Sequence, residues 1–262
     1  MDEELKFPDT HLVEIKSSYD ERKAHGVIEF IGSFETIDER RALFGLARRT
    51  ICRQENTDLD SLVAIAQAGI ADCMRAADTA KSAGDADAAY KLKDAANIFS
   101  YNLSADMAEC WPQDSIPRTV RHFEIGLSAS EDCLRWRHEL NKGPWPFSIA
   151  WWAKGAHELS LGRPFEAVES FRKEKRYAEL VLAEKDEKLD PNSDFGCVIA
   201  DGYLGLALTA AGDPTGIGIF QHACDAFTAL IPTGGDVGDD AKFGLEQVQT
   251  MRERITARGI IP

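Results

Sequence analysis

The sequence predicts an all-α protein built from antiparallel helical hairpins, and three observations support this fold class. Apolar residues recur at helical spacing from about residue 36 to the end, without the alternation that marks strands. Glycine turns at Gly84, Gly162 and Gly212 separate pairs of such segments. The composition, 44% hydrophobic and 28% charged residues, is that of a globular protein with a substantial core.

The first half of the chain divides into an N-terminal arm and three helices. Residues 1–35 form an acidic arm whose structure the pattern leaves open, since HLVEIK suits a strand whereas Val27, Phe30 and Ile31 have helical spacing. A helical-repeat domain is predicted over residues 36–262. Its first three helices are expected at about 36–54, opened by a Thr36–Glu39 capping box, at 57–82, opened by Thr57 and Asp60, and from 84–85 to the break at Trp111–Pro112.

The second half continues with helices separated by short turns. A fourth helix begins near Pro117 and ends at Gly143–Pro144, with no obvious partner in the chain. Two hairpins follow, and a last helix carries a single apolar stripe that ends before a capping glycine. These elements are expected at 148–187 around Gly162, at 194–230 around Gly212, and at 239–257 with the stripe Leu245, Val248, Met251 and Ile255 and the cap Gly259.

The middle hairpin resembles a tetratricopeptide repeat. In that family the first helix places a large and a small residue on its core side, and the second helix supplies a small residue and an aromatic. Trp151, Gly155, Ala167 and Phe171 match this pattern, and the hairpins around Gly84 and Gly212 match it in part. The resemblance covers roughly half the chain in an irregular array. It implies an α-α superhelix and a concave groove that binds other proteins.

The middle hairpin also departs from the family. Lys154, Glu158 and Glu174 occupy places where the family has apolar or small core residues. The strongest apolar stripe of the first helix, Ile149, Trp152, Ala153, Ala156 and Leu159, falls on the side that faces the groove in the family. Either the helix is rotated and this stripe is core, or the groove is apolar and something covers it. The cover would be residues 1–35, the fourth helix, a second subunit or a partner peptide.

The function expected first is that of a scaffold that binds a peptide or protein segment through this groove. A tryptophan anchor supplies a large contact area at low entropic cost, so affinity is expected to centre on Trp152. The binding residues expected on the groove side are Trp152, Met74, Asp78, Lys81, Ala156, Leu159 and Leu206.

Two other function classes remain open at this stage. A small-ligand or catalytic domain would use a partly buried polar cluster, because polar groups misplaced in a core often mark a site. The residues of that cluster are Lys154, His157, Glu158 and Glu174. A structural homo-oligomer, such as a homodimer, would instead bury the apolar stripe in its own interface.

The net charge, the cysteine spacing and the hydropathy of the chain each argue against one class of partner, cofactor or location. The net charge of −14 repels phosphate backbones, so nucleic acid is not an expected partner. The six cysteines are widely spaced, and neither His138–Glu139 nor His157–Glu158 completes an HExxH motif, so no metal or other cofactor is expected. No run of about 18 apolar residues could cross a membrane, and MDEELKFPDT lacks the order of a signal peptide, so we expect a cytoplasmic protein.

Overall fold

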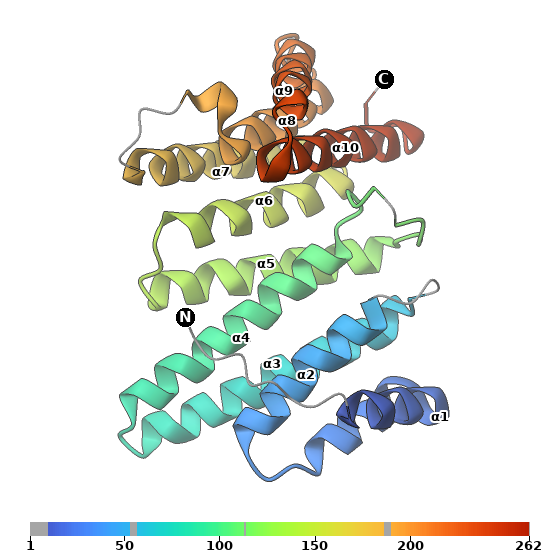
Figure 1. The fold of residues 1–262 in the computed structure, drawn as a ribbon, viewed down its shortest axis with the longest axis vertical. Helices are drawn as coiled ribbons and strands as arrows, with labels where there is room; N and C mark the ends of the chain where they lie inside the picture. Colours follow the sequence, from blue (N-terminus) through green and yellow to red (C-terminus); the bar gives the residue numbers. More distant parts are fainter. Residues whose placement is uncertain (1–9, 53–56, 113, 186–189, 262) are drawn as a thin grey trace. The chain divides into compact units, whose positions relative to one another are not determined.

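A computed structural model describes residues 10–52, 57–112, 114–185 and 190–261 (Figure 1). Every regular element in these residues is helical, which confirms the all-α class. The chain divides into two compact units, Met1–Asp106 and Met107–Pro262. The loop at residues 33–36, where the sequence analysis placed the end of the N-terminal arm, lies within the first unit.

The first unit contains four helical segments. Helix α1 packs against α2 and α3, and its buried side chains include Ile15, Val27 and Ile31. Within the N-terminal segment that the sequence pattern left open, the residues from Thr10 to Gly32 are therefore helical and contribute to the core of this unit. The segments are α1 (Thr10–Gly32), α2 (Ile37–Cys52), α3 (Leu59–Ser82) and α4 (Ala86–Met107).

Helix α1 is sharply bent rather than continuous. Arg22 and Lys23 have non-helical backbone angles, and Lys23 has φ 55° and ψ −144°, in a region that glycine occupies readily and lysine does not. The two halves fold back on each other at this bend. At Gly26 a Cβ atom would lie only 2.3 Å from the backbone oxygen of Ser18, so this glycine permits the close approach.

The strained backbone at Lys23 gives a first prediction. Lys23→Gly should raise the free energy of unfolding by about 1 kcal/mol, because glycine relieves a strain of about 1–3 kcal/mol and its greater freedom in the unfolded chain offsets part of that gain. Urea denaturation monitored by circular dichroism measures the change. In the regular part of α1, Lys16→Gly should lower stability by about 1 kcal/mol. A loss of stability in both variants would contradict the strain at Lys23.

Local capping chemistry fixes the starts of α2 and α3. The predicted capping box is confirmed, because the Glu39 amide donates to Thr36 Oγ1 at 3.3 Å and the Thr36 amide donates to Glu39 Oε2 at 3.2 Å. The start of α3 differs from the expected Thr57 cap. Asp58 is the N-cap and accepts a hydrogen bond from the Ser61 amide at 3.1 Å, because its carboxylate satisfies a free amide of the first turn.

The second unit holds the remaining helices, and consecutive helices from α5 to α10 pack against their neighbours. Figure 1 shows α5, α6 and α7 as successive antiparallel helices. The elements of this unit are α5 (Val120–Glu139), α6 (Pro144–Ser160), α7 (Pro164–Glu184), α8 (Phe195–Ala210), α9 (Gly216–Leu230) and α10 (Gly235–Ala257), with short 3₁₀ turns at Pro191–Ser193 and Ile231–Thr233.

The three predicted turn glycines have the same left-handed conformation. Gly84, Gly162 and Gly212 have φ of 82°, 70° and 80°. At each turn the glycine amide and the next amide donate back to carbonyls of the preceding helix, as in a Schellman cap. Glycine has no Cβ to clash in this conformation, so the sequence located these turns correctly.

Small residues let the two helices approach closely in the hairpins around Gly162 and Gly212. A Cβ atom at Gly155 would lie 2.7 Å from the Phe171 ring of α7, and one at Gly205 would lie 2.5 Å from the Phe220 amide nitrogen of α9. The fourth predicted helix, α5, also has a partner. It packs against α6, and a Cβ at Gly126 would lie 2.2 Å from the ring of His157.

Among the described helices, none combines the length and the apolar character that crossing a bilayer requires. Five of the six cysteines are buried and Cys52 is partly exposed. Burial raises the pKa of Cys73 and of Cys197 to about 12, which suits thiols that pack as small core residues.

Candidate functional site

The apolar stripe of α6 lies beside the face that packs on α7. Gly155 faces Phe171 on α7. The stripe residues Ile149, Trp152 and Leu159 lie about 120°, 60° and 40° around the helix from Gly155, all in the same direction. Trp152, Ala153, Ala156 and Leu159 are buried, and Ile149 is half-buried. The stripe is therefore mostly enclosed by protein.

Other parts of the same unit cover this stripe. The Trp152 ring packs edge-on against Trp111, at 5.8 Å between ring centroids, and against Tyr203 of α8, at 6.1 Å. Only 7% of Trp152 is exposed. Trp111 belongs to residues 107–112, which run from the last residue of α4 toward α5, so these residues and α8 supply a cover that was not among those expected from the sequence.

Helix α10 covers an apolar face of α8 that carries Ile199, Gly202 and Leu206. A Cβ atom at Gly202 would lie 2.9 Å from Val248 of α10, and Leu206 is buried. The predicted stripe of α10 is confirmed at Val248, Met251 and Ile255, which are fully buried, while Leu245 is half-buried. The inner faces of α6 and α8 are thus closed within the unit.

Residues 107–112 are held to α6 and to the C-terminal part of the unit by polar contacts. Glu109 accepts a hydrogen bond from Ser160 at the end of α6, at 2.6 Å, and forms an ion pair with Arg258 after α10. The Gln247 amide group of α10 donates to the Cys110 sulfur at 3.3 Å. Because Met107, Ala108 and Cys110 are almost fully buried, this segment is a fixed part of the unit.

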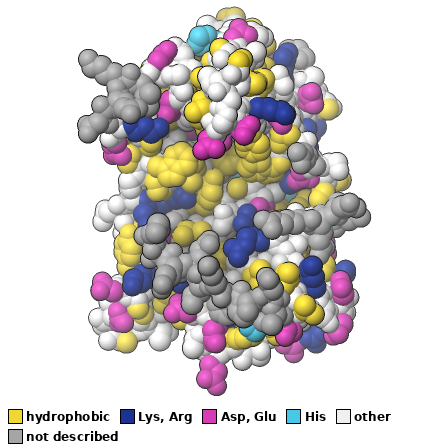
Figure 2. All heavy atoms as spheres, viewed as in Figure 1, with side chains coloured by type: hydrophobic (Ala, Val, Ile, Leu, Met, Phe, Trp, Pro, Cys, Tyr) yellow, Lys and Arg dark blue, Asp and Glu magenta, His cyan; other side chains and the backbone are white. Residues whose placement is uncertain are grey.

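One end of the stripe remains open. Trp145, one turn before Ile149 on the same face of α6, is 54% exposed. Phe243 of α10 is 44% exposed and stacks on the half-buried Trp111 at 6.2 Å between ring centroids. Figure 2 shows an apolar band over α6 beneath α10, with acidic side chains on its edge near the start of α10. We call Trp111, Trp145, Ile149 and Phe243, with Trp152 beneath them, the aromatic surface.

The predicted binding residues occur in both units. Trp152, Ala156 and Leu159 lie on α6 and Leu206 lies on α8, all of them buried in the second unit. The other three, Met74, Asp78 and Lys81, lie on α3 in the first unit, where Met74 is half-buried and the two charged residues are exposed.

The alternative polar cluster is dispersed among different neighbours. Lys154 forms ion pairs with Glu158 and with Glu131 of α5, the latter at 3.5 Å, and Ser170 of α7 donates to Glu158 at 2.5 Å. These contacts compensate the charges of Lys154 and Glu158, two of the three charged residues that the sequence pattern had placed in the core. His157 instead packs on α5, 6.4 Å from the Phe123 ring centroid.

Glu174 occupies a separate position between α7 and α8. Only 2% of the residue is exposed, and its Oε2 atom makes no hydrogen bond. Burial raises the pKa of its carboxyl well above the usual range, and the nearby Asp201 carboxylate raises it further. The charge of Asp201 is itself balanced by Lys175 at 2.6 Å. The predicted polar cluster therefore does not converge on one point.

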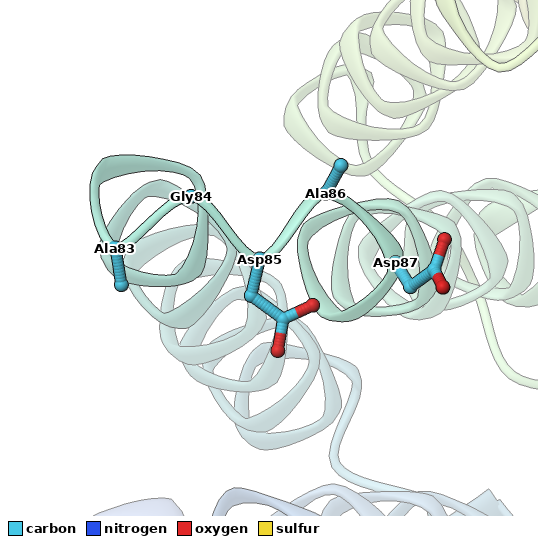
Figure 3. A pocket seen from close by; sticks show the side chains of 5 residues that line it. All are labelled: Ala83, Gly84, Asp85, Ala86 and Asp87. Atoms are coloured by element: carbon cyan, nitrogen blue, oxygen red, sulfur yellow. The ribbon is translucent and has the colours of Figure 1, made fainter.

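The open depressions found on the described surface are shallow. One of about 520 Å³ lies at the α3–α4 turn and is lined by five consecutive residues, Ala83 to Asp87 (Figure 3). The Asp85 carboxylate there caps α4 through the Ala88 amide at 2.9 Å, so it has a structural role. Another, of about 480 Å³, lies beside the turns of the two later hairpins and includes Phe165, which is 71% exposed.

The binding residues predicted from the sequence did not include Trp111, Trp145 or Phe243. Trp111 and Trp145 belong to a cluster of five tryptophans that suits either binding anchors or core packing, and only Trp152 of that cluster was predicted to bind. Phe243 lies outside the buried stripe of α10. A signal was present, since Trp145, Ile149 and Trp152 share one helix face. Within the described residues, no group of three or more histidine, cysteine or acidic side chains is arranged to hold a metal ion. Comparisons with protein-family models, curated proteins and solved structures find no match to this chain.

Proposed function

We propose that this protein is a tetratricopeptide-repeat-like scaffold that binds a peptide or protein segment at the aromatic surface of its second unit. The observation that carries this proposal is the exposed Phe243 ring, which stacks on the half-buried Trp111 above the stripe residue Trp152. Contiguous exposed aromatic residues mark interaction sites more often than chance, because leaving them in water is unfavourable.

The buried residues beneath this surface support the same function. Trp152 is fixed between Trp111 and Tyr203, and Tyr203 in turn stacks on Phe171 at 5.3 Å. A rigid base lowers the entropic cost of binding, because the exposed rings need little further ordering. In this proposal Trp152 is the floor of the site, and Phe243 and Trp145 are the anchors that a partner contacts.

The two other candidate functions have less support. A ligand-binding or catalytic cluster requires charged side chains that converge on a pocket, whereas Lys154 and Glu158 pair with each other and His157 and Glu174 face different helices. A homodimer could use only the aromatic surface as its interface, because Ala156 and Leu159 of the α6 stripe are buried within the unit. Size-exclusion chromatography with light scattering would detect such self-association.

Phe243→Ala tests the proposed site. Twelve-residue peptides selected on the full chain from a random display library should bind the variant at least tenfold more weakly, since truncating a central aromatic anchor costs about 1.4 kcal/mol or more. Fluorescence anisotropy with the strongest selected peptide gives the two dissociation constants. Phe243 is largely exposed, so the thermal unfolding midpoint should change little.

Phe165→Ala is the matched control, because it removes an equally large exposed ring outside the aromatic surface. It should leave peptide affinity within twofold of wild type. If Phe165→Ala abolished binding and Phe243→Ala did not, the binding site would lie at the depression beside Phe165. If the library yielded no binding peptide at all, the scaffold function would be wrong.

A further inference from the structure

The charges next to the aromatic surface specify its partner more closely. Asp236, Asp239 and Asp240 lie seven, four and three residues before Phe243 in α10. These spacings place all three carboxylates on the same side of the helix as the Phe243 ring. All three aspartates are exposed, and Figure 2 shows acidic side chains at this edge of the apolar band.

Few cations are available to neutralise this edge from within α10. Lys242 is exposed, but it directly precedes Phe243 and so projects about 100° away around the helix. Arg254 lies on the Phe243 side, but its guanidinium donates to backbone oxygens of Asp114 and Trp111. Glu246, half-buried one turn after Phe243, adds another negative charge. The α10 edge of the aromatic surface is therefore acidic.

Resting on the proposed function, we infer that the segment bound at the aromatic surface carries Lys or Arg next to a bulky apolar residue. The apolar residue packs against Phe243 and Trp111, and the neighbouring cation lies over Asp239 and Asp240. Opposite charges across a rim raise the association rate and select among partners, whereas a segment with acidic residues at this position would be repelled. An acidic or uncharged apolar segment is thus the disfavoured occupant.

The experiment compares the peptides selected on the full chain and their dependence on the two aspartates nearest to Phe243. Selected peptides should be enriched in Lys or Arg beside a large apolar residue. The double variant Asp239→Asn/Asp240→Asn should bind the strongest of them about fivefold more weakly than wild type at low salt, with a difference below about twofold in 0.5 M salt. The control Glu166→Gln/Glu253→Gln removes two exposed charges elsewhere and should change the affinity less than twofold.

The outcomes separate this inference from the proposed function. If peptides bind and lose affinity in Phe243→Ala, but show no excess of basic residues or bind the double variant as well as wild type, the basic partner is wrong and the scaffold function stands. If no peptide is selected, both fall together. Selection of acidic peptides would likewise overturn the basic partner.

Discussion

Trp152→Ala should lower the free energy of unfolding of the second unit by about 3–5 kcal/mol, the range for removing a large buried aromatic side chain. Trp152 is 7% exposed and packs between Trp111 and Tyr203, so its removal leaves a cavity between Trp111, α6 and α8. Urea denaturation followed by circular dichroism measures this loss. The thermal unfolding midpoint should fall in parallel.

Trp145→Ala is the matched control for this substitution. It removes the same type of side chain from the same helix, but from a position that is 54% exposed, so its cost should stay near 0.5 kcal/mol or below. If both variants lost less than about 1 kcal/mol, Trp152 would not be part of a packed core. The contacts that fix the floor of the aromatic surface would then be wrong.

The burial of Trp152 changes how the proposed function has to be tested. A partner lost from Trp152→Ala would report either a missing anchor or a destabilised unit, and the two cannot be separated by binding alone. Phe243 is 44% exposed and stacks on Trp111 at its surface, so truncating it removes contact area without opening a core cavity. The binding test therefore relies on Phe243.

The parts of the fold that local chemistry determines could be predicted from the sequence. Turn glycines such as Gly162 and Gly212 mark positions where the backbone must adopt positive φ, and the Thr36–Glu39 capping box satisfies free amides within four residues. Helical periodicity then identified the buried stripe of α10, because amphipathic spacing depends only on the helix repeat. These signals do not require knowledge of distant contacts.

The parts that depend on distant contacts could not be predicted. The hydrogen bond from Gln247 to Cys110 joins residues 137 positions apart, and no local pattern reveals that residues 107–112 cover α6. The bend in α1 is another case, since Lys23 carries no sequence signal for positive φ. Likewise, the pairing of α5 with α6 depends on Gly126 meeting His157 across 31 positions of sequence.

For the candidate site, too, local pattern predicted one part and distant contacts determine the rest. The periodicity of α6 correctly singled out the face that carries Trp152, but it could not say which end of that face is covered. Burial of Ala156 and Leu159 and exposure of Trp145 follow from where Trp111 and α8 pack. A stripe at helical spacing specifies a face of a helix, and only the packing of other elements distinguishes core from surface on it.

Glu174 is a buried carboxyl group for which the structure supplies no ion pair. Lys154 and Glu158 compensate each other, whereas the Glu174 carboxyl has an unbonded Oε2 atom and Asp201 as its nearest influential charge. A buried carboxyl in this situation is neutral in the folded state. In the unfolded chain the same group ionises near its ordinary pKa of 4.5. Above about pH 4.5 the folded state therefore keeps a proton on Glu174 that the unfolded state releases.

Glu174→Gln should consequently stabilise the protein by an amount that grows with pH. Below about pH 4.5 both states of wild type are protonated there, and the two proteins should have similar stability. Above that pH the folded state binds more protons, so the wild type loses about 1.4 kcal/mol per pH unit through this group until the raised folded-state pKa is passed, whereas the variant does not. Urea denaturation between about pH 4.5 and 8 measures the difference, with the exposed Glu253→Gln as a control that should show none. A constant difference across this range would mean that Glu174 ionises normally in the folded protein, and that water or a counter-charge reaches it between α7 and α8.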